Sequence, residues 1–476
     1  LKTGKPVQLL LERSEDIIAS TKRHPAAFRY RTALDARGRI TAMDVEIDLD
    51  GGAYAGLSSV VLQRAIFAAS GIYGIGNLRV KGQVLATNTV PTGAFRGFGA
   101  PQAFFAIEMH MERIAAELGV EPLEFKLSHA LRQGDETSTG GHIWQAVKLP
   151  EMVELIERMS GYTRKRSEIA QHDNGGVRRR RGIGLSLFFH GCGFTGSGEQ
   201  SVIKGRVTLV KQPNGRVEIL VSSTEMGQGP QTTLRKIVAG TLGIPLEDVL
   251  YANPDTDRVP DSGPTVASRT VMVVGRLLER AAIEMKARWN SEDAFSVTTG
   301  YRQPTWVEWD QDALRGDAYP TYSWGANVVE VAIDPLTYEI EICGAWGVYD
   351  IGTAIDERTV QGQIEGGIVQ GLGYATIEVM NTKAGRILQS SLTDYIVPTV
   401  KDVPPIQTGL VSNPYEDGPF GARGAGELPL VGAAPALAAA VRHALDLPVD
   451  DIPVTPEYLL QLMERESSRQ PGTGSR

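Results

Sequence analysis

Alternating hydrophobic and polar residues near the start of the chain predict a β-hairpin. Hydrophobic side chains recur at about every second position over residues 28–34 and again over 40–47, around the turn Ala36-Arg37-Gly38. Such alternation places one face of each strand against a core and the other toward water. A second hairpin is predicted over 205–210 and 217–221, because Asn-Gly between them suits a tight turn. A short apolar run at residues 7–11 predicts a further strand.

Hydrophobic positions at helical spacing predict four helices. The first covers 102–118, where Ile107, Met111, Ile114 and Leu118 share one face and Gly119 ends the helix. The others are predicted over 230–242, 266–288 and 435–445.

At roughly one domain per ~150 residues, the length of 476 residues allows about three domains, or two large ones. We predict two elongated α+β domains over 1–165 and 166–465, followed by a flexible tail over 466–476. The polar stretch 172–176 and the arginines at 178–181 are interpreted as a solvated connection between the domains.

Composition excludes several classes of protein. Hydrophobic residues make up 42% of the chain and charged residues 22%, which is typical of a folded protein. The net charge is −8, so no domain-wide positive field exists to meet nucleic-acid phosphates. No uninterrupted apolar run approaches the ~20 residues of a membrane span, and residues 1–5 lack a signal-peptide core. We therefore expect no nucleic-acid partner, no membrane span and a cytoplasmic location.

The metal-ligating residue types are sparse. Cys192 and Cys343 are the two cysteines, far apart in the chain, and the seven histidines show no ligand spacing. An iron–sulfur cluster needs four closely placed ligands, so any such cluster is expected on another chain. A zinc site is not expected.

Glycine is the unusual feature of the composition. The chain has 53 glycines, about 11% against an ordinary ~7%. Many gather in five clusters, which cover residues 93–99, 191–198, 227–229, 362–373 and 418–426. Glycine lets backbone amides approach a ligand closely, so the clusters suggest a chain that wraps a large polar cofactor. A set of bulges and tight turns remains the alternative.

Four short segments, three of which overlap these clusters, occur in a characteristic order. They are residues 93–102 (GAFRGFGAPQ), 224–229 (TEMGQG), 264–268 (PTVAS) and 424–430 (GAGELPL). Together they resemble the molybdenum-cofactor subunit of the xanthine dehydrogenase and aldehyde oxidase family, over nearly the whole chain. The resemblance implies two molybdopterin-binding domains with the cofactor at their interface.

The resemblance also implies which residues meet the cofactor. A molybdopterin-type cofactor is expected, with the cytosine dinucleotide form as one option, and its metal is held by pterin sulfurs. Arg96 and Ala267 are expected beside the metal. The segment 265–268 is interpreted as the first turn of a helix, whose free N–H groups suit an anion. The expected cofactor contacts are Phe95, Arg96, Gln228, Thr265, Ala267, Ser268, Gln363 and Gly426.

Glu427 is the expected catalytic base. A carboxylate withdrawn from water becomes a stronger base, and in the resembling enzymes this glutamate takes a proton. Arg64 matches the position that stabilises negative charge on a purine. The expected substrate contacts are Arg64, Phe98, Phe194, Thr195 and Val266. The alternatives are a helix-capping glutamate, an arginine on a helix surface and core phenylalanines.

The implied function is oxidation of an N-heteroaromatic compound such as xanthine or hypoxanthine, with water as the oxygen source. Electrons would pass to [2Fe-2S] and FAD partner chains. The family's large subunit begins earlier than Leu1, so we expect either a fragment or a further chain that supplies the missing part. Gly97 argues against a carbon monoxide dehydrogenase, which has cysteine there.

Three alternatives remain for the function. The first is a nicotinate-type or aldehyde hydroxylase of the same family. The second is a non-catalytic assembly subunit, in which the glycine loops dock partner chains. The third, hydrolysis by paired carboxylates at Glu225 or Glu365, is disfavoured because no spacing places two carboxylates on one face.

Overall fold

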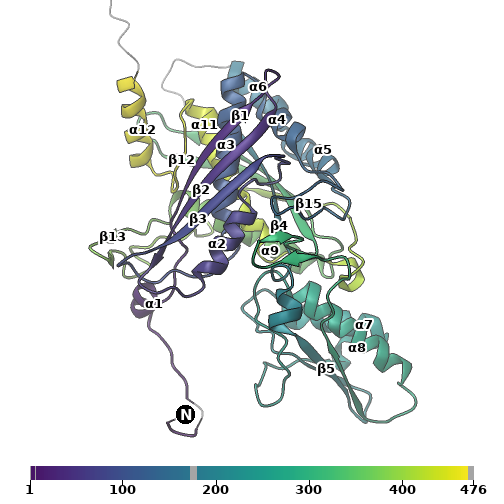
Figure 1. Ribbon diagram of the computed structural model, residues 1–476. Coiled ribbons are helices and arrows are strands. Elements are labelled where there is room, and N and C mark those ends of the chain that lie inside the picture. The colour runs from purple at the N-terminus through teal and green to yellow at the C-terminus, as the bar shows by residue number, and fades with distance from the viewer. Residues whose placement is uncertain (1, 6, 172–178, 470–476) are drawn as a thin grey trace, which may run out of the picture.

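The computed structural model describes residues 2–5, 7–171 and 179–469. Helices and strands are mixed, as an α+β fold requires. The long strands lie in the upper part of the molecule and a smaller unit of strands and two helices lies at its lower end (Figure 1).

The first predicted hairpin is confirmed. Strand β1 (Ala26–Leu34) pairs antiparallel with β2 (Ile40–Gly52), and β3 (Leu78–Ala86) pairs parallel with β2. Helix α2 (Ser58–Phe67) packs on this sheet, and α3 (Ala100–Leu118) runs alongside. The predicted helix at 102–118 is therefore confirmed, and Gly119 ends it in a left-handed conformation.

A four-stranded sheet forms the centre of the molecule. Its order is β15 (Ile406–Leu410), β12 (Ile340–Asp350), β11 (Tyr322–Ile333) and β4 (Arg180–Gly191). Every residue of β11 is buried, so this strand is covered on both faces. Helix α9 (Glu357–Thr376) and helix α11 (Ala433–Leu445) pack against the sheet. The helix predicted at 435–445 is confirmed as α11.

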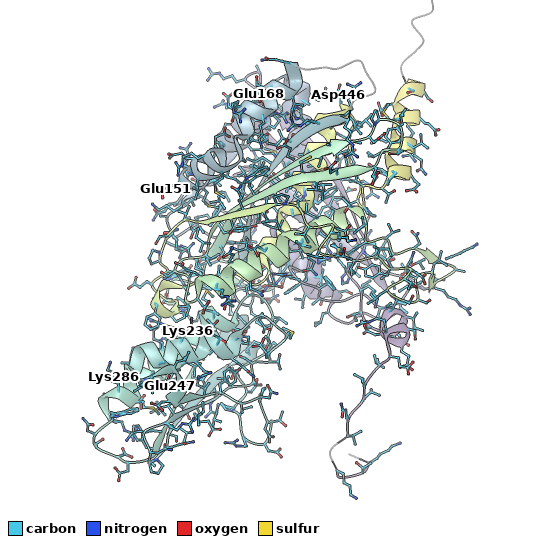
Figure 2. The ribbon with its side chains drawn as sticks, turned by 180° about the vertical axis from the view of Figure 1, so that it is seen from behind. Glu151, Glu168, Lys236, Glu247, Lys286 and Asp446 are labelled. Carbon is cyan, nitrogen blue, oxygen red and sulfur yellow. The ribbon has the colours of Figure 1, made fainter. Side chains whose placement is uncertain are left out.

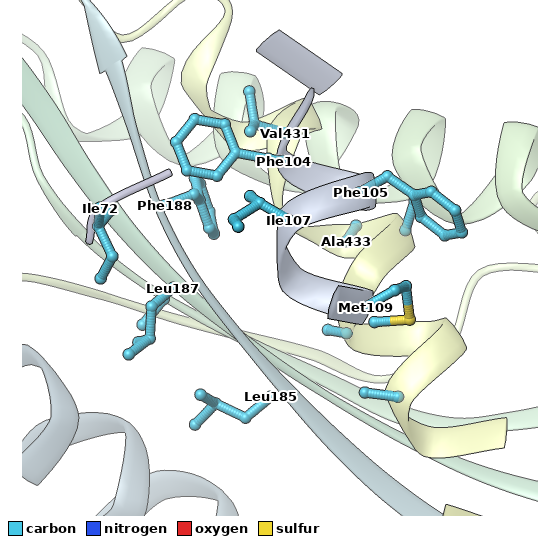
Figure 3. Close-up of a cluster of buried hydrophobic side chains, with 14 of the residues drawn as sticks. Ile72, Phe104, Phe105, Ile107, Met109, Leu185, Leu187, Phe188, Val431 and Ala433 are labelled. Atoms are coloured by element: carbon cyan, nitrogen blue, oxygen red, sulfur yellow. The ribbon is translucent and has the colours of Figure 1, made fainter. Parts of the chain in front are cut away.

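Helix α11 lies unusually close to strand β4. A Cβ at Gly184 would meet Ala436 O at 2.3 Å, and a Cβ at Gly182 would meet Ala440 O at 2.0 Å. Glycine at these two strand positions and alanine along the helix allow the close approach. Phe188 of β4 and Val431 lie next to Phe104 of α3, as Figure 3 shows.

Residues 206–300 build a second, separate core. Strands β7 (Val249–Leu250), β6 (Val217–Leu220), β5 (Arg206–Lys211) and β8 (Phe295–Gly300) form its sheet. Helices α7 (Pro230–Leu242) and α8 (Gly275–Ala287) cover that sheet, and Lys236, Glu247 and Lys286 mark this unit (Figure 2). The second hairpin and the helix at 230–242 are confirmed. The larger core draws on residues before and after 165, and the boundary between 165 and 166 stays a prediction.

The remaining elements connect these units or close their ends. They are α1 (Arg13–Ala19), α4 (Pro122–His129), α5 (Leu149–Ser160), α6 (Tyr162–Gln171), β9 (Trp309–Asp310), β10 (Arg315–Gly316), β13 (Thr382–Lys383), β14 (Arg386–Ile387), α10 (Leu428–Val431) and α12 (Pro456–Arg469), with short 3-10 or π turns at Glu199–Ile203, Leu246–Asp248, Thr270–Val274 and Pro419–Gly421.

Three sequence-based expectations are wrong. Residues 7–11 form no strand, because their apolar side chains, such as Leu9 at 84% exposure, meet no partner strand in the described part of the chain. Positions 180 and 181 belong to β4 rather than to a linker. Residues 466–469 continue α12, while 172–178 and 470–476 lie outside the described residues.

Within the described ranges, one helical stretch is long and apolar enough to cross a membrane. It is Leu428–Leu445, which joins α10 and α11, and 78% of it is buried in the protein. Its apolar character is explained by its packing against β4 and β11.

Candidate functional site

Glu427 lies at the end of a loop, directly before helix α10, and is only 8% exposed. Its Oε1 accepts a hydrogen bond from Gly97 N at 3.0 Å, and its Oε2 accepts one from Ser268 Oγ at 3.3 Å. Ser268 Oγ also accepts from the Glu427 backbone N–H at 3.1 Å. The carboxylate is therefore held in the protein and does not point into bulk water.

Arg96 joins three segments that are far apart in the sequence. Its Nε donates to Gly426 O at 2.7 Å, and its two terminal nitrogens donate to Gln363 O at 3.1 Å and Gln370 Oε1 at 3.2 Å. Burial lowers the pKa of Arg96, and the nearby Glu427 carboxylate opposes that effect. A guanidinium has five donors in a rigid fork, so it can fix these segments at once.

The loop that carries Ala267 differs from the expectation. Ala267 and Ser268 have φ angles of 57° and 51°, in the left-handed region, and helical structure starts only at Thr270. The prediction that 265–268 begins a helix is therefore wrong, and these residues do not supply the free N–H groups of a helix terminus on which the anion site was based. Ala267 is fully buried, and its carbonyl accepts a hydrogen bond from Gly193 N at 2.9 Å. A Cβ at Gly424 would lie 2.1 Å from Ser268 O.

A buried ion pair between Arg269 and Glu199 links the loop that carries Phe194 to the loop that carries Ala267. The sequence analysis did not predict this pair. Arg269 Nε and Nη2 donate to the Glu199 carboxylate at 2.7 and 2.8 Å, and both side chains are essentially excluded from water. Arg269 also donates to Ser262 O at 2.7 Å, and Glu199 Oε1 accepts from Phe194 N at 3.3 Å. The pair therefore holds the Phe194 loop against the Ala267 loop.

Arg64 lies beneath two aromatic rings. Its guanidinium carbon is 4.4 Å from the centre of the Phe98 ring and 5.1 Å from that of Tyr319, and one of its terminal nitrogens donates to Gly193 O at 2.8 Å. Burial raises the pKa of Tyr319, and Arg64 acts in the opposite direction. Phe98 is 5% exposed and belongs to the main core, so it forms a wall of the Arg64 site.

His190, which the sequence analysis did not single out, lies beside the glutamate. Its Nε2 is 3.7 Å from Glu427 Oε2, and the residue is 3% exposed. Burial lowers the pKa of His190 to about 4, while the charge of Glu427 opposes and that of Arg64 assists the shift. The imidazole is therefore neutral at neutral pH.

The other expected contacts lie around this centre or at its edge. The side-chain amide of Gln228 bonds within its own loop, donating to Thr224 O at 2.9 Å and accepting from Met226 N at 2.6 Å. Thr265 Oγ1 accepts from Thr224 N at 2.9 Å, which ties that loop to the Ala267 loop. Thr195 is 9% exposed, and Val266 is 39% exposed at the surface. The structure thus brings five of the expected residues together around one point, namely Arg96, Ala267, Ser268, Gly426 and Glu427. The Gln228 loop is linked to this group only through the bond of Thr224 to Thr265.

A large cavity lies next to Gln370, the hydrogen-bond partner of Arg96, although Arg96 itself does not line it. Its volume is about 920 Å³, and Phe95, Gly362, Gly366 and Gln370 are among its lining residues. A Cβ at either glycine would meet nothing within 4 Å, so bare helix backbone of α9 forms part of the wall. The volume suits a large organic ligand, since such pockets span ~300–1,000 Å³. Across the described ranges, no three His, Cys, Asp or Glu side chains cluster so as to hold a metal ion.

Comparison with protein families identifies both parts of the chain. Residues 1–129 and residues 155–404 each match a model described as a molybdopterin cofactor-binding domain. The second match alone covers more than half of the 476 residues.

Individual relatives agree with these matches. The chain is 29% identical to a probable xanthine dehydrogenase subunit of Bacillus subtilis, covering 99% of this chain and 66% of the relative. It is 27% identical to the aldehyde oxidoreductase of Megalodesulfovibrio gigas, covering 98% of this chain and 52% of the relative. The chain therefore spans about half to two thirds of the length of these relatives.

Solved structures share the fold. The aldehyde oxidoreductase from Desulfovibrio desulfuricans has a TM-score of 0.85 at 28% identity, over 97% of this chain and 51% of the relative. A Cu,Mo-containing CO dehydrogenase has a TM-score of 0.87 at 22% identity, over 97% of this chain and 64% of that one. At that identity, the second likeness concerns the fold alone.

Proposed function

We propose, from the premise that this chain belongs to the family of molybdopterin cofactor-binding domains, that it is the catalytic part of a molybdenum hydroxylase for N-heteroaromatic compounds. The observation that carries the proposal is the placement of Glu427. Its carboxylate is 8% exposed and receives hydrogen bonds from Gly97 and Ser268, which lie 330 and 159 positions away in the sequence. A fold that assembles a buried carboxylate from such distant segments fits a catalytic base.

The residues around Arg96 fit the cofactor. Its guanidinium is anchored to Gly426 and to helix α9, and the cavity of about 920 Å³ lined by its neighbour Phe95 and its partner Gln370 is large enough for a pterin cofactor. Phe95 is 44% exposed on the wall of this cavity and offers a flat apolar face. We propose Phe95, Arg96 and Gln363 as residues that hold the cofactor, with Gln228 and Ala267 at its metal end. When bound, the cofactor supplies a two-electron oxidation.

Glu427 is proposed to take the proton from the water that supplies the oxygen atom. Gly97 N and Ser268 Oγ fix the orientation of its carboxylate, so the proton acceptor needs no rearrangement during the reaction. General-base catalysis by a positioned carboxylate typically contributes ~10²–10⁴-fold to the rate.

Arg64 is proposed to recognise the substrate. Arg64 is 3% exposed, and Phe98 and Tyr319 shield its guanidinium, so its positive charge acts in a region withdrawn from bulk water. Negative charge that builds on a heteroaromatic ring would be stabilised there. Phe194, Thr195 and Val266 complete the proposed substrate-binding set.

Further chains are part of the proposal. Because the chain covers 66% of one relative and 52% of another, a companion segment or chain is proposed to complete the subunit. Chains with [2Fe-2S] clusters and FAD would take the electrons, and the complex is proposed to lie in the cytoplasm.

The decisive experiment combines metal analysis with one substitution. The native complex should contain about one molybdenum per chain and oxidise xanthine or hypoxanthine. Glu427→Ala should lower kcat at least ~10²-fold with unchanged molybdenum content. Glu339→Ala, at an exposed position between β11 and β12, serves as the control. A complex without molybdenum would support an assembly subunit, and turnover of aldehydes without purines would favour an aldehyde hydroxylase.

A further inference from the structure

A small cavity lies beside His190, the neighbour of the proposed base. Its volume is about 20 Å³, and Arg64, His190 and Tyr319 are among the side chains that line it. One water molecule needs ~10–15 Å³ together with two or more polar partners. The cavity is therefore large enough for one water and too small for a substrate.

Two polar atoms of this lining lack partners within the described part of the chain. They are Arg64 Nε and His190 Nδ1, and each residue is only 3% exposed. An unpaired buried polar atom is unfavourable because it has lost its water without gaining a partner. Each therefore calls for a hydrogen-bond partner in the cavity that both residues line.

The two atoms have complementary roles. Arg64 Nε–H can only donate. His190 Nε2 lies 3.7 Å from the Glu427 carboxylate, beyond a direct hydrogen bond, and the tautomer with its hydrogen on Nε2 is favoured because a lone pair there would face the negative charge. His190 is neutral, so its Nδ1 has a free lone pair and can only accept. A water molecule can accept from the arginine and donate to the histidine at the same time.

We propose that one water molecule bridges Arg64 Nε and His190 Nδ1, and that His190, held in this way, is a positioning residue for the Glu427 carboxylate. The inference rests on the proposed function, because it extends the machinery of the same site. The chain from Arg64 through water and His190 to Glu427 couples the substrate-recognising cation to the base. It also fixes the tautomer that presents Nε2–H to Glu427 Oε2.

The charged groups around His190 and Glu427 decide in which direction a substitution of His190 moves the pH profile. Glu427 and Arg64 are the charged groups that act on His190, and Arg23 and Arg96 also act on Glu427. Removal of the Nε2–H dipole withdraws one interaction that favours the ionised carboxylate, while both arginines remain. The acid limb of kcat/KM should therefore move to higher pH.

The first test is a crystal structure of the native complex at a resolution that shows ordered water. We expect one water within hydrogen-bond distance of Arg64 Nε and His190 Nδ1, and its loss in His190→Phe. A dry cavity in the wild-type complex would overturn the bridge. This readout does not depend on turnover, so it remains decisive if the wild-type complex proves to be inactive or without molybdenum.

The second test is the pH profile of kcat/KM at unchanged molybdenum content. His190→Phe should move the acid limb up by about 0.5–1 pH unit, a loss of ~3–10-fold on that limb with little change at high pH. His190→Gln places an amide N–H near the Nε2 position and should restore the limb, whereas His190→Asn should not. His443→Gln, which removes a buried histidine of α11, is the matched control. Superimposable profiles for wild type and His190→Phe would overturn the positioning role.

Discussion

The buried pair of Glu199 and Arg269 offers the sharpest test of how the site is held together. Glu199→Gln keeps the size of the side chain and removes its charge, which leaves the Arg269 guanidinium buried with hydrogen bonds to carbonyl oxygens only. Two charge-assisted bonds, at 2.7 and 2.8 Å, are weakened or lost. The expected effect is a loss of unfolding free energy and displacement of the loops that carry Phe194 and Ala267.

The magnitude follows from the burial of both partners. Bonds to charged groups contribute about 1.5–3 kcal/mol each, and breaking a buried ion pair by removing one partner costs about 3–5 kcal/mol. At ~2.1 cal/mol/K of unfolding entropy per residue, a chain of 476 residues shifts by about 1 °C per kcal/mol, so the melting temperature should fall by roughly 3–5 °C. The exposed pair of Arg258 and Glu218, also 2.8 Å apart, provides the control, and Glu218→Gln should cost no more than about 1 kcal/mol.

The assay is thermal unfolding of the purified complex, with the double variant Glu199→Gln/Arg269→Met completing a mutant cycle. The losses of unfolding free energy for the two single variants should add up to about 2 kcal/mol more than the loss for the double variant, and this difference is the coupling energy. A loss below about 1 kcal/mol for Glu199→Gln, or strictly additive effects, would refute the reasoning.

Three further predictions concern substrate, packing and pH. Arg64→Met should reduce kcat/KM for purines more than for aldehydes, and equal losses would remove its proposed role. Gly184→Ala should destabilise the fold by several kcal/mol, because the new Cβ would lie 2.3 Å from Ala436 O, whereas Gly362→Ala, with nothing within 4 Å, should be neutral or stabilise α9 by about 0.5–1 kcal/mol in thermal unfolding. Burial lowers the pKa of His443 to about 4, so the unfolded chain binds more protons and stability should fall as pH drops from about 6.5 to 4. His443→Gln should flatten that dependence in melting curves recorded across this range, and an unchanged slope would contradict it.

Local patterns were reliable where a segment packs on one face. Strand β2 of the first hairpin has a clear period, since every second residue from Met43 to Leu49 is buried and those between are not. Helix α3 keeps apolar residues at helical spacing, although residues 100–112 include no exposed position. Strand β11 offers no such period, because all its residues are buried, and the sequence analysis did not identify it. The run at 7–11 has strand-like composition, but composition does not supply a neighbouring strand.

The site shows the same division. The short glycine segments indicated Arg96, Ser268 and Glu427, and the structure brings these three together. The left-handed backbone at Ala267 and Ser268 was missed, since helical periodicity after 270 suggested an earlier helix start. His190 and Glu199 were also missed, because each is a single polar residue whose partner lies more than 60 positions away.

By itself the sequence determined the net charge, the order of those helices and strands that have a regular hydrophobic pattern, and the short segments that contain Arg96, Ser268 and Glu427. These properties depend on neighbouring residues, which interact in any conformation that the chain adopts. The tertiary structure decided which loops meet, how far Glu427 is withdrawn from water and that Arg64 and His190 line one small cavity. Such contacts exist only after distant segments pack, because side chains hundreds of positions apart acquire a shared low-dielectric environment only then.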